Sequence, residues 1–155
     1  MNAENFLTLI ARQFAELQLD AVMIGNAAAS IRGAPVTTLD IDFMLEHTDE
    51  NYRKIAALAQ RISCKFIEMK LPGDNYMYRI AHETGTPSFD FMFAAAGINN
   101  YEALKKNSTE IAFGEHTLKI ASLEDVLASK RAAGRPKDMA VIPILEMTLD
   151  ELRKQ

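Results

Sequence analysis

Two aspartates alternate with large apolar residues in the segment TTLDIDFML at residues 37–45. Successive side chains of a β-strand point to opposite faces, so a strand here has two different faces. One face is apolar enough to pack against a core and holds Leu39, Ile41, Phe43 and Leu45. The other face holds Thr38, Asp40, Asp42 and Met44. The strand rise separates the α-carbons of the two aspartates by about 7 Å, so their carboxylates can converge on a cation.

A third acid occupies the same kind of position in the segment SFDFMF at residues 88–93. A strand here places Asp90 on the face opposite to Phe89, Phe91 and Phe93. Burying a carboxylate without a partner is costly, so Asp90 needs either water or a cation. If the two segments are neighbours in a sheet, Asp90 joins Asp40 and Asp42 in a cluster of hard oxygen ligands that suits Mg²⁺. The alternative is that Asp90 lies on an edge strand and faces water.

The rest of the chain alternates between helical and strand patterns, without repeats or linkers. Apolar spacing and capping signals predict helices at residues 3–18, 26–33, 49–63, 99–107, 122–134 and 136–153. Short apolar runs predict strands at 21–25, 37–45, 65–71, 76–83 and 88–93, and two more around Gly114. The predicted fold class is α/β (α+β). Residues 1–155 are expected to form a single domain, with a central mixed sheet and flanking helices.

Composition and charge narrow the classes of function. Of the 155 residues, 48% are hydrophobic and 25% charged, and the formal net charge of −4 disfavours a large basic surface for nucleic acid. No apolar run reaches the roughly 20 residues of a membrane span, and the N-terminus lacks a signal-peptide pattern. The single cysteine, Cys64, allows no intramolecular disulfide and suits a reducing compartment. We therefore expect a cytoplasmic protein with no membrane partner.

Several groups could bind phosphate. Gly25 ends the strand at 21–25 just before an alanine-rich helix, and such a junction offers backbone N–H groups that an anion can approach closely. Arg32, on that short helix, either reaches an acceptor or faces water. The four cations of KRAAGRPK, at residues 130–137, either form a solvated helix junction or contact phosphate or RNA.

Together these motifs resemble the signature of the DNA polymerase β-type nucleotidyltransferase superfamily: a glycine, a small residue, a short helix, and then Asp-x-Asp on the next strand. The segment IGNAAASIRGAPVTTLDIDFML is most similar to the minimal, AbiEii-like branch associated with toxin–antitoxin and phage-defence systems. Its matching residues are Gly25, Asn26, Ala28, Gly33, Pro35, Thr38, Asp40 and Asp42. FDFMF resembles the strand with the third acid, Asp90. SLEDVLASKRAAGRPKD resembles the closing helix–turn–helix segment, with Lys130, Arg135 and Asp138.

The resemblance implies Mg²⁺-dependent transfer of a nucleoside monophosphate from a nucleoside triphosphate to an acceptor hydroxyl. Asp40, Asp42 and Asp90 would be the catalytic acids and would hold two Mg²⁺ ions, with Asp90 helping to deprotonate the acceptor. The residues that would bind the nucleotide are Gly25, Asn26 and Lys130. The acceptor would be a tRNA end, a protein, or a small molecule such as an aminoglycoside. Because a chain of 155 residues leaves little room for an acceptor domain, an antitoxin partner or a homo-oligomer could complete the site.

Two positions depart from the pattern of the superfamily. Asn26 stands where serine or glycine usually follows the signature glycine, and Val36 stands where relatives often carry arginine. Asparagine can still donate to a phosphate or cap the helix, whereas valine removes a phosphate or acceptor contact. The intact acids favour an enzyme. Asn26 and Val36 favour a catalytically degenerate member that binds a nucleotide or a partner protein, and a metal-binding structural domain is a third alternative.

Overall fold

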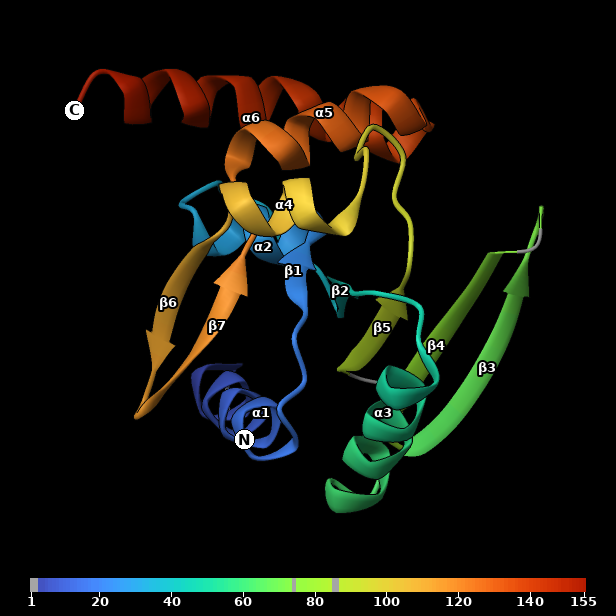
Figure 1. The fold of residues 1–155 in the computed structure, drawn as a ribbon. Coiled ribbons are helices and arrows are strands. Elements are labelled where there is room, and N and C mark those ends of the chain that lie inside the picture. Colours follow the sequence, from blue (N-terminus) through green and yellow to red (C-terminus); the bar gives the residue numbers. More distant parts are fainter. Residues whose placement is uncertain (1–2, 74, 85–86) are drawn as a thin grey trace.

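The computed structural model describes residues 3–73, 75–84 and 87–155, and within them it contains six helices and seven strands (Figure 1). The helices are α1 (Ala3–Leu17), α2 (Gly25–Ile31), α3 (Asp49–Arg61), α4 (Tyr101–Asn107), α5 (Leu123–Ala133) and α6 (Pro136–Arg153). The strands are β1 (Val22–Ile24), β2 (Asp40–Met44), β3 (Lys65–Leu71), β4 (Asn75–Ala81), β5 (Ser88–Met92), β6 (Thr109–Phe113) and β7 (His116–Ile120). Every element expected from the sequence is present.

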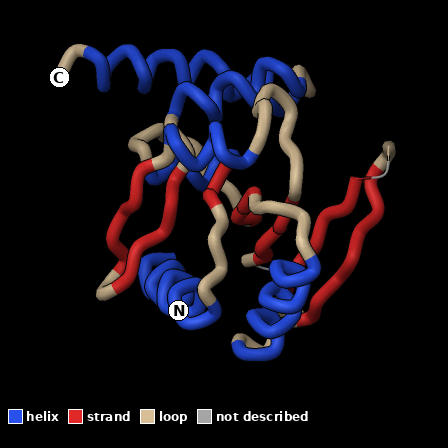
Figure 2. The backbone as a smooth tube through the Cα atoms, in the orientation of Figure 1, coloured by secondary structure: helices blue, strands red, loops and turns tan. Residues whose placement is uncertain are grey.

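The strands form one mixed sheet in the order β3-β4-β5-β2-β1-β7-β6. β2 lies at its centre, antiparallel to β1 and parallel to β5, and β5 is antiparallel to β4. The hairpins β3–β4 and β6–β7 form the two edges. Figures 1 and 2 show the strands between two groups of helices, with α1 and α3 in one group and α2 and α4–α6 in the other. The predicted α/β class, with a central mixed sheet and flanking helices, is confirmed.

Aromatic side chains fill the face of the sheet that α1 covers. Phe43 of β2 and Phe91 of β5 are paired in register, and their rings stack with centroids 5.6 Å apart. From α1, Phe14 lies 4.9 Å from Phe43, and Phe6 lies 5.1 Å from Phe89. Because side chains alternate along β2 and β5, this packing turns the intervening aspartates to the opposite face.

The start of β2 differs from the prediction. Leu39 was expected in the core, but it lies before the strand and is 70% exposed. The Thr38 hydroxyl accepts the Asp40 N–H at 3.1 Å and donates to the Asp40 carbonyl at 2.8 Å. The Leu39 carbonyl still accepts the Ser88 N–H of β5 at 3.3 Å, so the backbone stays beside the sheet while the Leu39 side chain projects into solvent.

The junction between α5 and α6 is built around a buried acid. Ser122 caps α5 by accepting the Asp125 N–H, and Gly134 ends it with a φ of 60°. Asp138, in the first turn of α6, is completely buried and accepts from the Arg135 side chain at 2.7 Å, while the Lys130 ammonium lies 3.6 Å away. Burial would raise the pKa of Asp138, but the Arg135 hydrogen bonds and the Lys130 charge lower it overall.

Asp138→Ala is expected to lower the free energy of unfolding by about 2 kcal/mol, because it leaves the mostly buried Lys130 ammonium without its partner. Urea unfolding followed by circular dichroism measures the change. Asp150→Ala, an exposed acid later in the same helix, is the control and should change stability little. Equal effects of the two substitutions would show that the buried network does not hold the junction together.

Candidate active site

Sheet register brings the two acidic segments together. Along one row across four strands, Ile24 of β1 is paired with Asp42 of β2, Asp42 with Asp90 of β5, and Asp90 with Arg79 of β4. Register partners on neighbouring strands share a face, so these side chains project to the same side of the sheet. The expectation that the two segments are neighbours is confirmed, and the alternative of Asp90 on an edge strand is wrong, because β5 lies between β2 and β4.

Asp90 is buried and is held by an arginine that the sequence analysis missed. Asp90 is 4% exposed, and its two carboxylate oxygens accept hydrogen bonds from the Nε and Nη2 of Arg79 at 2.7 and 3.0 Å. The hydrogen bond to Asp90 raises the pKa of Arg79 more than burial lowers it. The sequence signal that could have pointed to Arg79 was the alternation of side chains in YMYRIA, which puts Arg79 on the same strand face as Met77. Its partner could be identified only from the β4–β5 register.

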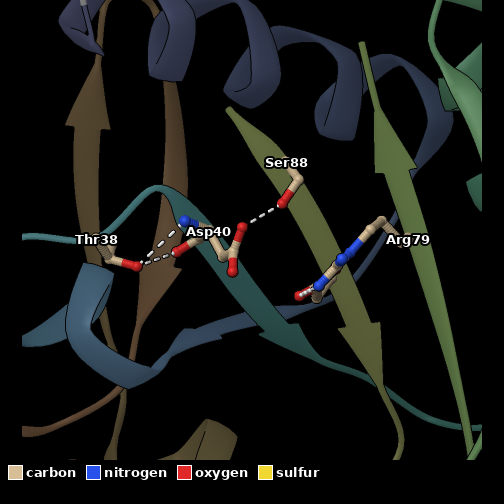
Figure 3. Close-up of polar contacts among 5 residues, drawn as sticks. Thr38, Asp40, Arg79 and Ser88 are labelled. Carbon is tan, nitrogen blue, oxygen red and sulfur yellow. Dashed lines mark hydrogen bonds and ion pairs between the residues drawn. The ribbon is translucent and has the colours of Figure 1, made fainter. Parts of the chain in front are cut away.

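Asp40 lies next along the same face, closer to solvent. Its residue is exposed, and its carboxylate accepts a hydrogen bond from the Ser88 hydroxyl on β5 (Figure 3). Ser88 is itself buried and is paired in register with Asp40. Figure 3 also shows the Thr38 hydroxyl against the Asp40 backbone and Arg79 on the far side of β5 from Asp40. Strand pairing and two hydroxyl contacts therefore fix the backbone and the carboxylate of Asp40.

Asp42 is the least compensated of the three acids. Burial raises its pKa to about 6, the negative charges of Asp90 and Asp40 add to this rise, and the cations Lys130 and Lys137 oppose it. Among the described residues no hydrogen bond or ion pair to the Asp42 carboxylate occurs. A partly buried carboxylate beside two others, with no direct partner, is electrostatically unfavourable in the free protein. An added cation would relieve that cost.

Gly25 opens α2 directly against Asp42. Its φ is +69°, and a β-carbon built on it would lie 3.0 Å from the Asp42 Oδ2. The next residue, Asn26, has a buried side-chain oxygen without a hydrogen-bond partner among the described residues. The turn thus keeps the Gly25 backbone close to the Asp42 carboxylate, and the residue that follows has a buried oxygen that none of the described residues satisfies.

Gly25→Ala is expected to weaken divalent-cation binding several-fold, because the new methyl group displaces the Asp42 carboxylate. It should also cost about 1 to 2 kcal/mol of stability, because alanine resists a positive φ. Gly73→Ala is a matched control: its φ is +77°, and no other part of the described chain beyond its neighbours lies within 4 Å of the added carbon. Calorimetric titration with Mn²⁺ checks both variants. Equal cation affinity in the two would show that the close approach to Asp42 has no role in binding.

Arg32 and Lys130, two of the cations that could bind phosphate, have structural partners. Arg32 was expected to reach an acceptor or face water; the structure shows it partly buried and bonded to backbone carbonyls, and contact with an acceptor stays a prediction. Its guanidinium donates to the carbonyls of Ile120 and Ala121, at 2.9 and 3.0 Å, and so ties α2 to the end of β7. Lys130 has a side chain only 14% exposed, facing Asp138, although its charge still reaches Asp42. Burial lowers the pKa of Lys130 more than Asp138 raises it.

The chemistry of the donors suits a hard cation. Three carboxylates from two adjacent strands are the ligand type that Mg²⁺ prefers, and in the described part of the chain no counter-charge contacts Asp42. As they stand, the described residues include no group of three or more His, Cys, Asp or Glu side chains arranged to hold a metal ion. The carboxylates of Asp40 and Asp42 have the right chemistry to bind such an ion, while the carboxylate of Asp90 is hydrogen-bonded to Arg79.

Comparisons with known proteins give similarity of fold without similarity of sequence. No protein-family model matches the chain, and no curated protein matches it. The lincosamide antibiotic adenylyltransferase LnuA, with lincomycin bound, is 15% identical with a TM-score of 0.63, over 94% of this chain and 96% of that one. The antibiotic-resistance factor ANT(2'')-Ia is 15% identical with a TM-score of 0.62, over 96% of this chain and 86% of that one.

A third structure is that of TM1012 from Thermotoga maritima, a proposed nucleotidyltransferase. It is 14% identical with a TM-score of 0.57, over 100% of this chain and 97% of that one. At such identities the likeness is one of architecture, and it extends over nearly the whole length of the chain. The protein therefore has a nucleotidyltransferase-like fold.

Proposed function

We propose that this protein is a nucleotidyltransferase, which moves a nucleoside monophosphate from a nucleoside triphosphate to an acceptor hydroxyl. The observation that carries the proposal is the pairing of Asp42 with Asp90 across two parallel strands, with Asp40 on the same face. The nucleotidyltransferase-like fold supports it, because the acids lie on the central strands of that fold.

In the proposed reaction, the acceptor oxygen forms a bond to the α-phosphorus while the bond to the bridging oxygen breaks and pyrophosphate leaves. The carboxylate of Asp90 takes the proton from the acceptor hydroxyl. Gly25 and Asn26 bind the triphosphate beside Asp42, and Lys130 adds positive charge from α5. Asp40 and Asp42, with Asp90, would hold the Mg²⁺ ions, which would supply charge neutralisation for the triphosphate and the leaving pyrophosphate.

A small molecule is the acceptor class that we favour over tRNA or protein. LnuA is named for lincosamide antibiotics, and ANT(2'')-Ia is an antibiotic-resistance factor. The chain also carries a formal net charge of −4, which disfavours a large RNA surface. A toxin–antitoxin or phage-defence role rests on the AbiEii-like resemblance alone.

A second candidate is a degenerate member of the superfamily that binds a nucleotide without transferring it. The bidentate Arg79–Asp90 pair favours this candidate, because it occupies the oxygens of the proposed base. The two candidate functions differ in whether pyrophosphate is released. The enzyme releases pyrophosphate when nucleotide and acceptor are both present, and the binding protein does not.

Calorimetric titration with ATP, GTP, CTP and UTP, with and without Mg²⁺, tests the site. The proposal expects Mg²⁺-dependent binding of at least one nucleotide in the micromolar range, lost in the double variant Asp40→Ala/Asp42→Ala. Asp150→Ala, an exposed acid on α6, serves as the control and should bind as the wild type does. Binding that survives in the double variant would place the nucleotide elsewhere, and no binding of any nucleotide would overturn the proposal.

A further inference from the structure

Arg79 occupies the part of the acidic face that a cation at Asp90 would need. Its Nε and Nη2 take one carboxylate oxygen each, at 2.7 and 3.0 Å. The Asp90 side chain is only 6% exposed, so water does not compete freely for those oxygens. A two-point contact of this kind is among the stronger hydrogen-bonded ion pairs in proteins.

The pairing is built into the sheet. Arg79 and Asp90 are register partners on the antiparallel strands β4 and β5, so the backbone holds them opposite each other. Beyond Arg79 in the same row lies Ile67 of the edge strand β3, which is 42% exposed. The Arg79 side chain is itself 33% exposed, so it is partly in contact with solvent while it holds Asp90. Because the side chain is not fully buried, an Arg79 guanidinium that withdraws from Asp90 would keep its charge in contact with water.

The three acids differ in what already compensates them. Asp90 has a guanidinium, Asp40 has the Ser88 hydroxyl, and Asp42 has no direct partner among the described residues. A divalent cation beside Asp90 would face a fixed positive charge in direct contact with both oxygens. Like charges at such a distance repel strongly at a partly buried site.

We propose that Arg79 is a built-in competitor for the cation at Asp90. In the free protein it confines cation binding to Asp40 and Asp42, and Asp90 joins the site only when Arg79 withdraws. Arg79 is thus a positioning residue that determines when the third acid becomes available. The inference rests on the proposed function for the identity of the acidic cluster as a cation site. A different arrangement, in which Arg79 stays in place and orients Asp90 as a ligand, predicts the opposite change in affinity.

Titration of the full chain with Mn²⁺ alone, followed by electron paramagnetic resonance of the free ion, tests the proposal. Arg79→Gln is expected to bind Mn²⁺ at least about tenfold more tightly than the wild type. The gain should disappear in Arg79→Gln/Asp90→Asn, because the freed carboxylate is then absent. Lys70→Gln removes a cation from the face of β3 that carries Phe66, opposite to the face of Arg79, and should leave the affinity unchanged. Unchanged or weaker binding in Arg79→Gln would overturn the proposal.

Arg79→Lys provides a second variant if Arg79→Gln does not fold. Lysine keeps the charge but cannot span both oxygens, so Mn²⁺ binding should tighten by a smaller factor. Binding no tighter than that of the wild type would again overturn the proposal. The measurement is independent of catalysis. Tighter Mn²⁺ binding by Arg79→Gln, without nucleotidyl transfer by the wild type, would overturn the proposed function and support this inference. Nucleotidyl transfer by the wild type, with unchanged Mn²⁺ binding by Arg79→Gln, would support the proposed function and overturn this inference.

Discussion

Asp42→Asn is expected to lower the rate of nucleotidyl transfer at least about a thousandfold, which corresponds to about 4 kcal/mol of transition-state stabilisation. Asp42 lies between Asp90 and the Gly25 turn, and no described residue places a counter-charge in contact with it. Asparagine has nearly the same shape but no charge, so it removes the cation ligand without creating a cavity. Pyrophosphate release in the presence of nucleotide and acceptor measures the rate.

Asp150→Asn, on the exposed part of α6, removes the same charge far from the acids in the sequence and should keep the wild-type rate. Asp90→Asn should also lose most activity, because Asp90 is the proposed base. Transfer by Asp42→Asn at a rate close to that of the wild type would contradict the assignment of this carboxylate to the reaction.

The same Asp42→Asn substitution is expected to stabilise the fold at neutral pH by between about 1 and 3 kcal/mol in the absence of divalent cations. In the folded protein, burial and the neighbouring carboxylates raise the pKa of Asp42 from 3.8 to about 6. Between these two values the folded state binds more protons than the unfolded state, so this group lowers stability as the pH rises. Above about pH 6 the full cost is present, and below about pH 4 it is absent.

Urea unfolding in a chelating buffer, at about pH 4 and about pH 7.5, separates this effect from a general change in packing. The stability difference between Asp42→Asn and wild type should be near zero at the lower pH and largest at the higher one. A gain that is equal at both pH values, or a loss at neutral pH, would show that the charge of Asp42 is compensated in the free protein. The expected pattern is that of a functional acid retained at a cost in stability.

The local parts of the fold followed from alternation and capping. The two faces of β2 and β5, the helix start at Ser122 and the stop at Gly134 all depend on residues close together in the chain. The sequence left open whether Asp90 lay beside Asp42 or on an edge, because strand order depends on contacts between distant segments. The parallel β2–β5 register settled that question.

Contacts between distant side chains were not predictable in the same way. The Arg79–Asp90 pair needs the β4–β5 register, and the Arg32 contacts need the position of α2 against the end of β7. The Lys130–Asp138 contact depends on how α6 turns back on α5, although the two residues lie in one sequence motif. Leu39 lies just before β2 and is exposed, although alternation along the segment had placed it on the core face.

The most direct test of the central claim is nucleotidyl transfer itself. The wild-type protein would be incubated with α-phosphate-labelled ATP or GTP, Mg²⁺ and a mixture of small hydroxyl compounds that includes lincosamides and aminoglycosides. We expect Mg²⁺-dependent pyrophosphate release, matched by label on one acceptor, from the wild type, and neither signal from Asp40→Ala/Asp42→Ala. Tight Mg²⁺-dependent nucleotide binding without pyrophosphate release on any acceptor, including tRNA and protein, would contradict the account and identify a binding protein instead.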